Sequence, residues 1–403
     1  MKISFVSTCI LDVTKYITLI FSLIILFMLY SCNSDSTTST DKVQIAVYYF
    51  PNWGPVQDSE WGLIIDAKPQ FPDHHQPKVP FWGYDDESQP SAMSRKIDAA
   101  STHGIDAFIF DWYYYDPPTD ERPGGKYLYK ALEEGFLQAP NNKDLKFAIM
   151  WCNHDVGLMK GEVSPETFEE MTDYIIERYF RHPSYWKVNG CPYFSIYQFF
   201  TFLKSFGDDN NLASGTIKRF RDKVKAAGFP DLHLNACLWG VKGDDLQETL
   251  NMYDVNSITS YVWMHHNQLE DFPATEYTKA GDAYFNCVES GGGHNGLEKP
   301  ISTISTPYHI NVTMGWDSSP RCRNSPEWMD RRDYPFGAII KNNTPDLFKR
   351  YLIKAKELTA LKPEHERIIT INSWNEWGEG SYLEPDTKHG MSYLEAVKDV
   401  FSK

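Results

Sequence analysis

The chain has 403 residues and a formal net charge of −15 at pH 7. This acidity argues against nucleic acid and against an anionic membrane surface as partners, because both would repel the protein. The length is ample for a large core, and it fits either one big domain or two ordinary ones.

The N-terminus has the pattern of an export signal. An apolar run over residues 16–29 follows two lysines, is short for a membrane span, and leads into Ser31-Cys32. This pattern resembles a bacterial lipoprotein signal with Cys32 as the lipidated residue. We predict a signal peptide over residues 1–31, a polar tether over 32–42 and one folded domain over 43–403. The expected location is the envelope of a Gram-negative bacterium, in the periplasm or on the outer-membrane surface, with membrane contact only through the lipid. An uncleaved N-terminal anchor helix is the alternative.

Beyond the tether, short β-rich runs alternate with longer helical patterns. The strands are predicted over residues 43–50, 105–113, 146–151, 192–197, 232–239, 257–262, 301–305 and 367–373. The helices are predicted over residues 91–103, 127–137, 164–180, 216–227, 245–252, 275–289, 345–361 and 392–401. Strict alternation implies crossover connections and a parallel sheet, and eight units favour a closed (β/α)8 TIM barrel with long βα loops. No GxGxxG sequence follows the first strand, which argues against a dinucleotide-binding fold.

Aromatic and polar residues accumulate after the predicted strands, where such barrels assemble their active sites. Flat rings bury the apolar faces of sugars, and neighbouring polar groups bind hydroxyls. The candidate substrate-binding residues are Tyr49, Trp53, Asp111, Trp112, Asn153, His154, Tyr197, Trp239, Tyr261, Trp263, Trp316, Asp317, Arg321, Asn375 and Trp377. The alternative for each single tryptophan is core packing. Asp111 could orient a hydroxyl or a water or have a structural role, and Asp317 with Arg321 could bind sugar or form a salt bridge.

Two carboxylates follow the last predicted strand. Cleavage of a glycosidic bond usually needs one carboxyl group to protonate the leaving oxygen and a second to act as nucleophile or base. Glu376 and Glu379 lie three positions apart among two tryptophans and two glycines, in the segment WNEWGEG. A turn there would point both side chains into one cavity, and the flanking rings would raise one pKa. We predict these two residues as the catalytic pair, against the alternative of a solvated loop.

No metal or cofactor is expected. The His154-Asp155 and His265-His266 pairs occur without an HExxH motif or another recognised ligand spacing. Five cysteines lie beyond Cys32, an odd number without a CxxC motif, so buried free thiols are the simplest reading and one disulfide stays open.

Four segments carry a family resemblance. They are INSWNEWGEGSYLEPD (371–386), YYFPNW (48–53), GIDAFIFDWYYY (104–115) and GWDSSPR (315–321). They resemble the WbsX-like group, which is similar to the family 99 glycoside hydrolases, the endo-α-1,2-mannosidases and mannanases. In family 99 the motif reads Glu-Trp-His-Glu. The resemblance implies that Glu376 acts as a base on the substrate 2-hydroxyl and Glu379 as the general acid/base. Gly378 stands where family 99 has His, a departure that bears on the substrate subsite, and so on mannose specificity, and leaves the two acids in place.

These observations lead us to expect an exported, monomeric glycoside hydrolase acting on a poly- or oligosaccharide, with an α-mannoside and endo action as the case suggested by the resemblance. Two alternatives stay open. One is a glycosyltransferase of polysaccharide biosynthesis, a role assigned to some members of the group. The other is a glycan-binding lipoprotein without catalysis, which would keep an aromatic cleft and have no use for paired acids.

Overall fold

The computed structural model describes residues 42–241, 245–322 and 334–402. The predicted signal peptide, Cys32 and almost all of the tether lie outside these residues. From Val43 onward the chain forms one compact unit. No helix among the described residues is long and apolar enough to cross a membrane.

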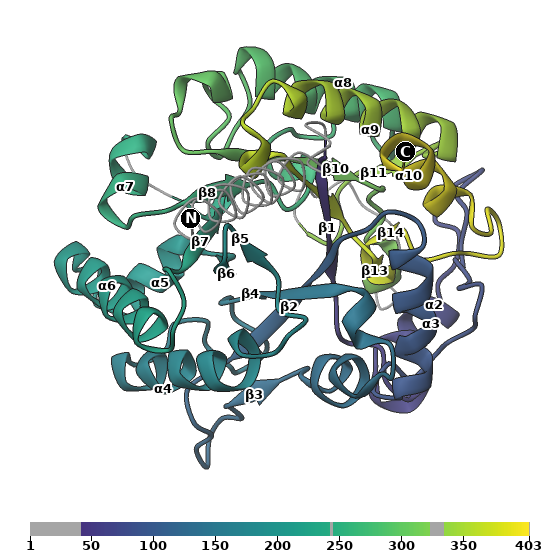
Figure 1. The fold of residues 1–403 in the computed structure, drawn as a ribbon. Helices are drawn as coiled ribbons and strands as arrows, with labels where there is room; N and C mark the ends of the chain where they lie inside the picture. Colours follow the sequence, from purple (N-terminus) through teal and green to yellow (C-terminus); the bar gives the residue numbers. More distant parts are fainter. Residues whose placement is uncertain (1–41, 242–244, 323–333, 403) are drawn as a thin grey trace, which may run out of the picture. The chain divides into compact units, whose positions relative to one another are not determined.

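Eight parallel strands close into a barrel with helices around it (Figure 1). The strands are β1 (Gln44–Tyr49), β2 (Ala107–Tyr114), β4 (Lys146–Trp151), β6 (Cys191–Ile196), β7 (His233–Cys237), β8 (Ser257–Thr259), β10 (Tyr308–Thr313) and β12 (Ile368–Asn372). Each pairs with the next along the chain, and β1 pairs with both β2 and β12, so the ring has no free edge. The predicted TIM barrel is therefore confirmed.

The outer ring follows the same order. Its helices are α3 (Pro90–Ser101), α4 (Pro165–Ile175), α6 (Asn210–Ala226), α7 (Leu246–Met252), α8 (Tyr277–Ser290), α9 (Pro345–Ala360) and α10 (Ser392–Phe401). Local signals set their ends. Ser164 caps α4 by accepting a hydrogen bond from the Thr167 amide at 3.1 Å, and prolines occupy the first turns of α4 and α9.

Short elements decorate the loops. They are α2 (Trp61–Ile65), α5 (Phe199–Lys204), β3 (Lys126–Tyr127), β5 (Lys187–Val188), β9 (Ala274–Glu276), β11 (Ile339–Lys341), β13 (Asn375–Glu376) and β14 (Ser381–Tyr382). The sequence did not predict them, because elements of two to six residues are too short to show a recognisable apolar period.

Two predicted elements are wrong in place or type. The seventh strand is Tyr308–Thr313, whereas residues 301–305 hold only a short 3-10 turn, Ile301–Thr303. The apolar period of the true strand is masked by His309 and Asn311, which are buried in the polar barrel interior. The predicted helix over 127–137 is instead β3 followed by a π turn and a 3-10 turn over Ala131–Gln138.

Candidate active site

The loop after β12 folds into a tight hairpin that presents both predicted acids. Glu376 lies in β13 and Glu379 ends a 3-10 turn, after which Gly380 adopts a left-handed conformation with φ of 62°. The hydroxyl of Ser373 accepts a hydrogen bond from the Glu376 amide at 2.9 Å and donates one to the Ser381 carbonyl at 2.7 Å. The hairpin is thus fixed at both arms.

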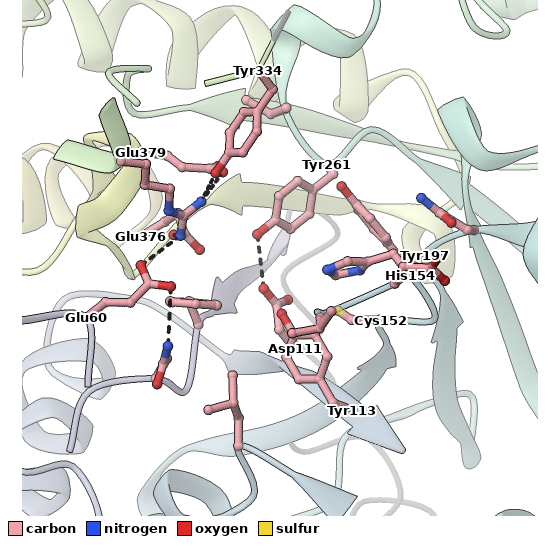
Figure 2. Close-up of a pocket in the computed structure, with 18 of the residues that line it drawn as sticks. Glu60, Asp111, Tyr113, Cys152, His154, Tyr197, Tyr261, Tyr334, Glu376 and Glu379 are labelled. Carbon is pink, nitrogen blue, oxygen red and sulfur yellow. Dashed lines mark hydrogen bonds and ion pairs between the residues drawn. The ribbon is translucent and has the colours of Figure 1, made fainter. Parts of the chain in front are cut away.

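Both carboxylates line a cavity of about 610 Å³ at the carboxyl ends of the barrel strands. Figure 2 shows Glu376 and Glu379 on one wall, Asp111 and Tyr113 opposite them, and Tyr261 between the two groups. Eight predicted site residues line this cavity: Asp111, His154, Tyr197, Tyr261, Trp316, Arg321, Glu376 and Glu379. A cavity of this size, with aromatic walls and a few converging polar groups, is typical of a small-molecule or sugar site.

Arg321 joins three carboxylates. One terminal nitrogen, Nη1, donates to Glu379 Oε1 at 2.7 Å, while Nη2 donates to Glu376 Oε1 and to Glu60 Oε2, both at 3.0 Å. The hydroxyl of Tyr334 also lies against Nη1. The guanidinium fork therefore ties the two predicted acids to one another and to the loop after β1.

Burial dominates the electrostatics of the pair. It raises the pKa of Glu376 well above the usual range and also raises the pKa of Glu379, while Arg321 lowers both. Because the two groups are close and buried, they titrate as a pair rather than separately. The pair therefore retains a proton in a pH range where a free glutamate would have lost it.

The opposite wall carries a third acid. Asp111 lies in the second half of β2 and accepts a hydrogen bond from the Tyr261 hydroxyl at 3.0 Å, while its second oxygen has no partner among the described residues. Burial raises its pKa well above the ordinary value. Burial also lowers the pKa of His154 to about 4 and that of His265 to about 3, so both imidazoles are neutral at pH 7.

The other nine predicted binding residues do not line this cavity: Tyr49, Trp53, Trp112, Asn153, Trp239, Trp263, Asp317, Asn375 and Trp377. Their side chains take part in packing and internal hydrogen bonds. The indole N–H groups of Trp53, Trp112 and Trp263 donate to the Asn375 carbonyl, the Tyr179 hydroxyl and the Asn311 carbonyl at 2.8, 3.1 and 3.1 Å. These three tryptophans therefore pack in the core, which was the alternative to substrate binding.

The remaining residues of that set have structural partners as well. Tyr49 is buried with its hydroxyl on the sulfur of Met93, and Asn153 bonds the backbone of Gln198. Trp239 is partly exposed and packs against the rings of Tyr197 and His265, which line the cavity. Asp317 lies outside the cavity because Lys78 and His74 hold its carboxylate at 2.7 and 2.9 Å, which keeps its pKa far below the usual range.

A buried charged cluster anchors the hairpin that follows β12. Lys96 lies between Glu87 and Glu384 and bonds both carboxylates. Glu87 also accepts from the Asn375 amide at 3.1 Å, and Glu384 accepts from the Trp377 indole at 2.9 Å. Both residues that flank Glu376 are thereby anchored to one buried ammonium group. Burial among these carboxylates raises the pKa of Glu87 to about 7.

Several cavity residues were not among the predicted site residues, and three of them, Glu60, Tyr127 and Tyr334, carry polar groups from loops that the sequence did not connect with the site. Glu60 and Tyr334 lie in loops rather than at the end of a barrel strand, and Tyr127 reaches the cavity through the short β3, which pairs with β2. Only the dense run of polar and aromatic residues over 51–61 hinted at a role for the first loop.

No group of three or more His, Cys, Asp or Glu side chains among the described residues has metal-binding geometry. The five cysteines beyond Cys32 are unpaired, and burial raises the pKa of Cys152, which lines the cavity, well above its normal value. A buried neutral thiol is a poor nucleophile.

The same barrel occurs in solved glycosidase structures. The GH99 endo-alpha-mannosidase of Bacteroides thetaiotaomicron gives a TM-score of 0.51 at 15% identity, over 88% of this chain and 96% of that one. A structure described as a glycoside hydrolase-like protein gives a TM-score of 0.52 at 14% identity, over 90% of this chain and 95% of the other. At these identities the likeness shows the fold alone, a TIM barrel.

Sequence comparison places the chain more closely. It is 24% identical over 392 residues to protein WxcX of Xanthomonas campestris pv. campestris strain B100, covering 89% of this chain and 50% of the relative. The chain thus spans about half the length of the curated relatives it matches. A family model described as glycosyltransferase WbsX matches residues 52–397. The chain therefore belongs to the WbsX family.

Proposed function

We propose that this protein is an exported glycoside hydrolase that cleaves a glycosidic bond of a poly- or oligosaccharide with Glu376 and Glu379. The observation that carries the proposal is the convergence of these two carboxylates on one guanidinium within the cavity. Glycoside cleavage needs one carboxyl that is protonated and one that is ionised. A buried, coupled pair whose pKa values are both raised keeps one proton at higher pH than a free glutamate does, and so supplies both states.

The resemblance to family 99 supplies an order of events. Glu376 removes the proton of the substrate 2-hydroxyl, whose oxygen attacks the anomeric carbon, while Glu379 gives its proton to the leaving glycosidic oxygen. The attack closes a strained ring between C1 and O2. Water then opens this ring at C1 as Glu379 takes the water proton and Glu376 returns its proton to O2. Both carboxyl groups finish in their starting states.

The cavity walls suit a sugar near these acids. Tyr113, Tyr197, Tyr261 and Trp316 offer ring surfaces for C–H faces, and the free oxygen of Asp111 offers a partner to a hydroxyl. The raised pKa of Asp111 extends the pH range in which its carboxyl group is protonated. The protonated group can donate a hydrogen bond to a sugar hydroxyl, and the ionised group can accept one. We propose these residues as the sugar-binding surface opposite the catalytic pair.

The family description favours a second candidate, a glycosyltransferase. A transferase would move a sugar from an activated donor to an acceptor hydroxyl in place of water. One activity assay distinguishes the two functions. Purified protein is incubated with a nucleotide sugar and an acceptor in one reaction, and with a plain oligosaccharide in the other. A hydrolase turns over only the second mixture.

The direct test is a product-analysis screen of α-linked mannans and other glycans with wild type and Glu379→Gln. An enzyme loses turnover in the variant while glycan binding, measured by calorimetry, persists. A non-catalytic sugar-binding protein gives no products in either form and equal binding in both. Failure of every glycan to be cleaved, with turnover of a nucleotide sugar, would move the assignment to the transferase.

Export and lipidation form a separate proposal about the N-terminus. The apolar run and Cys32 support an envelope protein anchored by a lipid on that cysteine. Expression of the full chain and Cys32→Ala in a Gram-negative host tests it by membrane fractionation and intact-mass analysis. The wild type is expected in the membrane fraction with a diacylglyceryl-type mass increase, and the variant is expected without that increase. A mass equal to the uncleaved chain would instead indicate an anchor helix.

A further inference from the structure

The position of Gly378 links two residues that the family motif does not contain. A Cβ atom placed on Gly378 would lie 3.0 Å from Arg321 Nη2 and 3.0 Å from Glu60 Oε2. Such contacts are tighter than side chains normally tolerate. The Arg321–Glu60 ion pair, at 3.0 Å, therefore occupies the space next to the hairpin into which a larger residue at position 378 would project.

The ion pair is built into the site. Arg321 exposes 19% of its side chain and Glu60 exposes 23%, while Glu376 and Glu379 expose 3% and 13%. Glu60 also accepts a hydrogen bond from the Asn52 side chain at 3.3 Å, which ties it to the segment after β1. Among the described residues, the terminal nitrogens of Arg321 thus donate to carboxylates and to the Tyr334 hydroxyl.

We infer that Arg321 is a positioning residue that holds Glu376 and Glu379 in one arrangement and balances their charge, and that Glu60 fixes Arg321 in the space left by Gly378. The inference rests on the proposed function, because it assigns the two residues to the same reaction. Arg321 acts through the two acids, and Glu60 acts through Arg321.

The charge balance has a definite sign. Arg321 favours the ionised forms of Glu376 and Glu379, whereas the negative charge of Glu60 opposes them. Asp111 is the other acid that acts on Glu376, in the same sense as Glu60. The phenols that face the pair belong to Tyr113, Tyr197, Tyr261 and Tyr334, and burial raises their pKa values so that they stay neutral in the working pH range.

Two substitutions should consequently move the pH profile in opposite directions. In Arg321→Met the pKa values of the pair rise, so both limbs of the kcat/KM profile move to higher pH by about one unit or more. In Glu60→Gln they fall, and both limbs move to lower pH. Arg321→Lys keeps the positive charge but loses the two-pronged guanidinium group. The limbs of its kcat/KM profile should therefore stay near those of wild type, while turnover drops about tenfold or more.

Matched controls come from an exposed ion pair. Glu177 and Arg181 bond each other at 3.1 Å on the surface, so Glu177→Gln and Arg181→Met repeat the same chemical changes away from the cavity. Neither control variant should shift either limb of the kcat/KM pH profile. A merely structural role for Arg321 and Glu60 would lower the rate of both site variants without opposite shifts, and that result would overturn the inference.

A stability measurement tests the same electrostatics without any substrate. An acid whose pKa is raised in the folded state stabilises that state at low pH, and this stability is lost as pH rises through the folded pKa. The fall in Tm between pH 5 and pH 8 should therefore be larger in Arg321→Met and smaller in Glu60→Gln than in wild type. Equal falls in all three proteins would refute the charge balance.

The two readouts separate the inference from the proposed function. If no glycan is cleaved but the Tm differences appear with opposite signs, the hydrolase assignment fails and the role of Arg321 stands. If Glu379→Gln abolishes cleavage while both site variants leave the pH limbs and the Tm differences unchanged, the hydrolase stands and the inference is wrong.

Discussion

The side-chain amide of Asn375 forms two hydrogen bonds with the backbone of Phe50. Its oxygen accepts from the Phe50 amide at 2.8 Å, and its nitrogen donates to the Phe50 carbonyl at 2.9 Å. These bonds join the segment after β12 to the segment after β1, one residue before Glu376. A side chain predicted to touch substrate therefore fixes the backbone that carries a catalytic candidate.

Replacement of Asn375 by Ala should destabilise the protein by about 2–4 kcal/mol, because two buried backbone groups lose their partners. Turnover should fall as well, since the Glu376 backbone loses its anchor. Urea unfolding and steady-state kinetics measure the two effects. Asn142→Ala, which removes one partly exposed hydrogen bond to the Leu137 carbonyl, is the control and should cost below about 1 kcal/mol. A similar small loss in both variants would refute the anchoring role.

Lys96 should be among the most costly residues to replace. Its ammonium group is fully buried between Glu87 and Glu384, so Lys96→Met leaves two buried carboxylates without a cation. Loss of one partner from a buried ion pair costs about 3–5 kcal/mol. The matched control, Lys349→Met, breaks an exposed pair with Asp399 and should cost less than about 1 kcal/mol. Equal unfolding midpoints for the two variants would contradict the burial of this cluster.

Glu87 gives the protein a pH-dependent stability. Its folded pKa of about 7 lies above the value of an unfolded glutamate, so its contribution is complete at low pH and is lost as pH rises toward and through 7. Glu87→Gln should therefore reduce the loss of unfolding free energy between pH 5 and pH 8, by about 2 kcal/mol. Urea titrations at both pH values measure it. An unchanged pH dependence would show that Glu87 is ionised in the folded protein at pH 5.

Two tryptophans distinguish the cavity wall from the core. Trp263 is 1% exposed and packs on α8 and α9, so Trp263→Ala should cost about 3–5 kcal/mol of stability. Trp316 lines the cavity, so Trp316→Ala should raise KM for the cleaved glycan with a smaller loss of stability. A KM increase confined to Trp263→Ala would mean that the sugar binds elsewhere.

The barrel was predictable because its signals are local. Capping residues such as Ser164, glycines after helices and apolar runs along buried parallel strands all occur within a few residues of the elements that they define. The seventh strand was misplaced for a related reason. Its inward residues, His309 and Asn311, are polar, and their partners lie on other strands: Asn311 donates a hydrogen bond to Thr370, and the ring of His309 stacks on that of Tyr193.

The site was only partly predictable. A sequence places a residue at a strand end but does not say whether its side chain points into the barrel mouth or outward under the helices. That choice separates Tyr261, which lines the cavity, from Trp263, which packs beneath α8. Glu60 was missed because its place at Arg321 depends on the course of a long loop and on the absence of a side chain at Gly378.

Cleavage in H₂¹⁸O tests the central claim most directly. A glycan identified in the screen is incubated in labelled water with wild type, Glu376→Gln and Glu379→Gln. The masses of the products are then determined by mass spectrometry. The wild type should place one ¹⁸O at the new reducing end, and each variant should lose at least about a thousandfold in rate, because each removes one of two required carboxyl groups. Products without ¹⁸O, or unchanged rates in both variants, would contradict hydrolysis by Glu376 and Glu379.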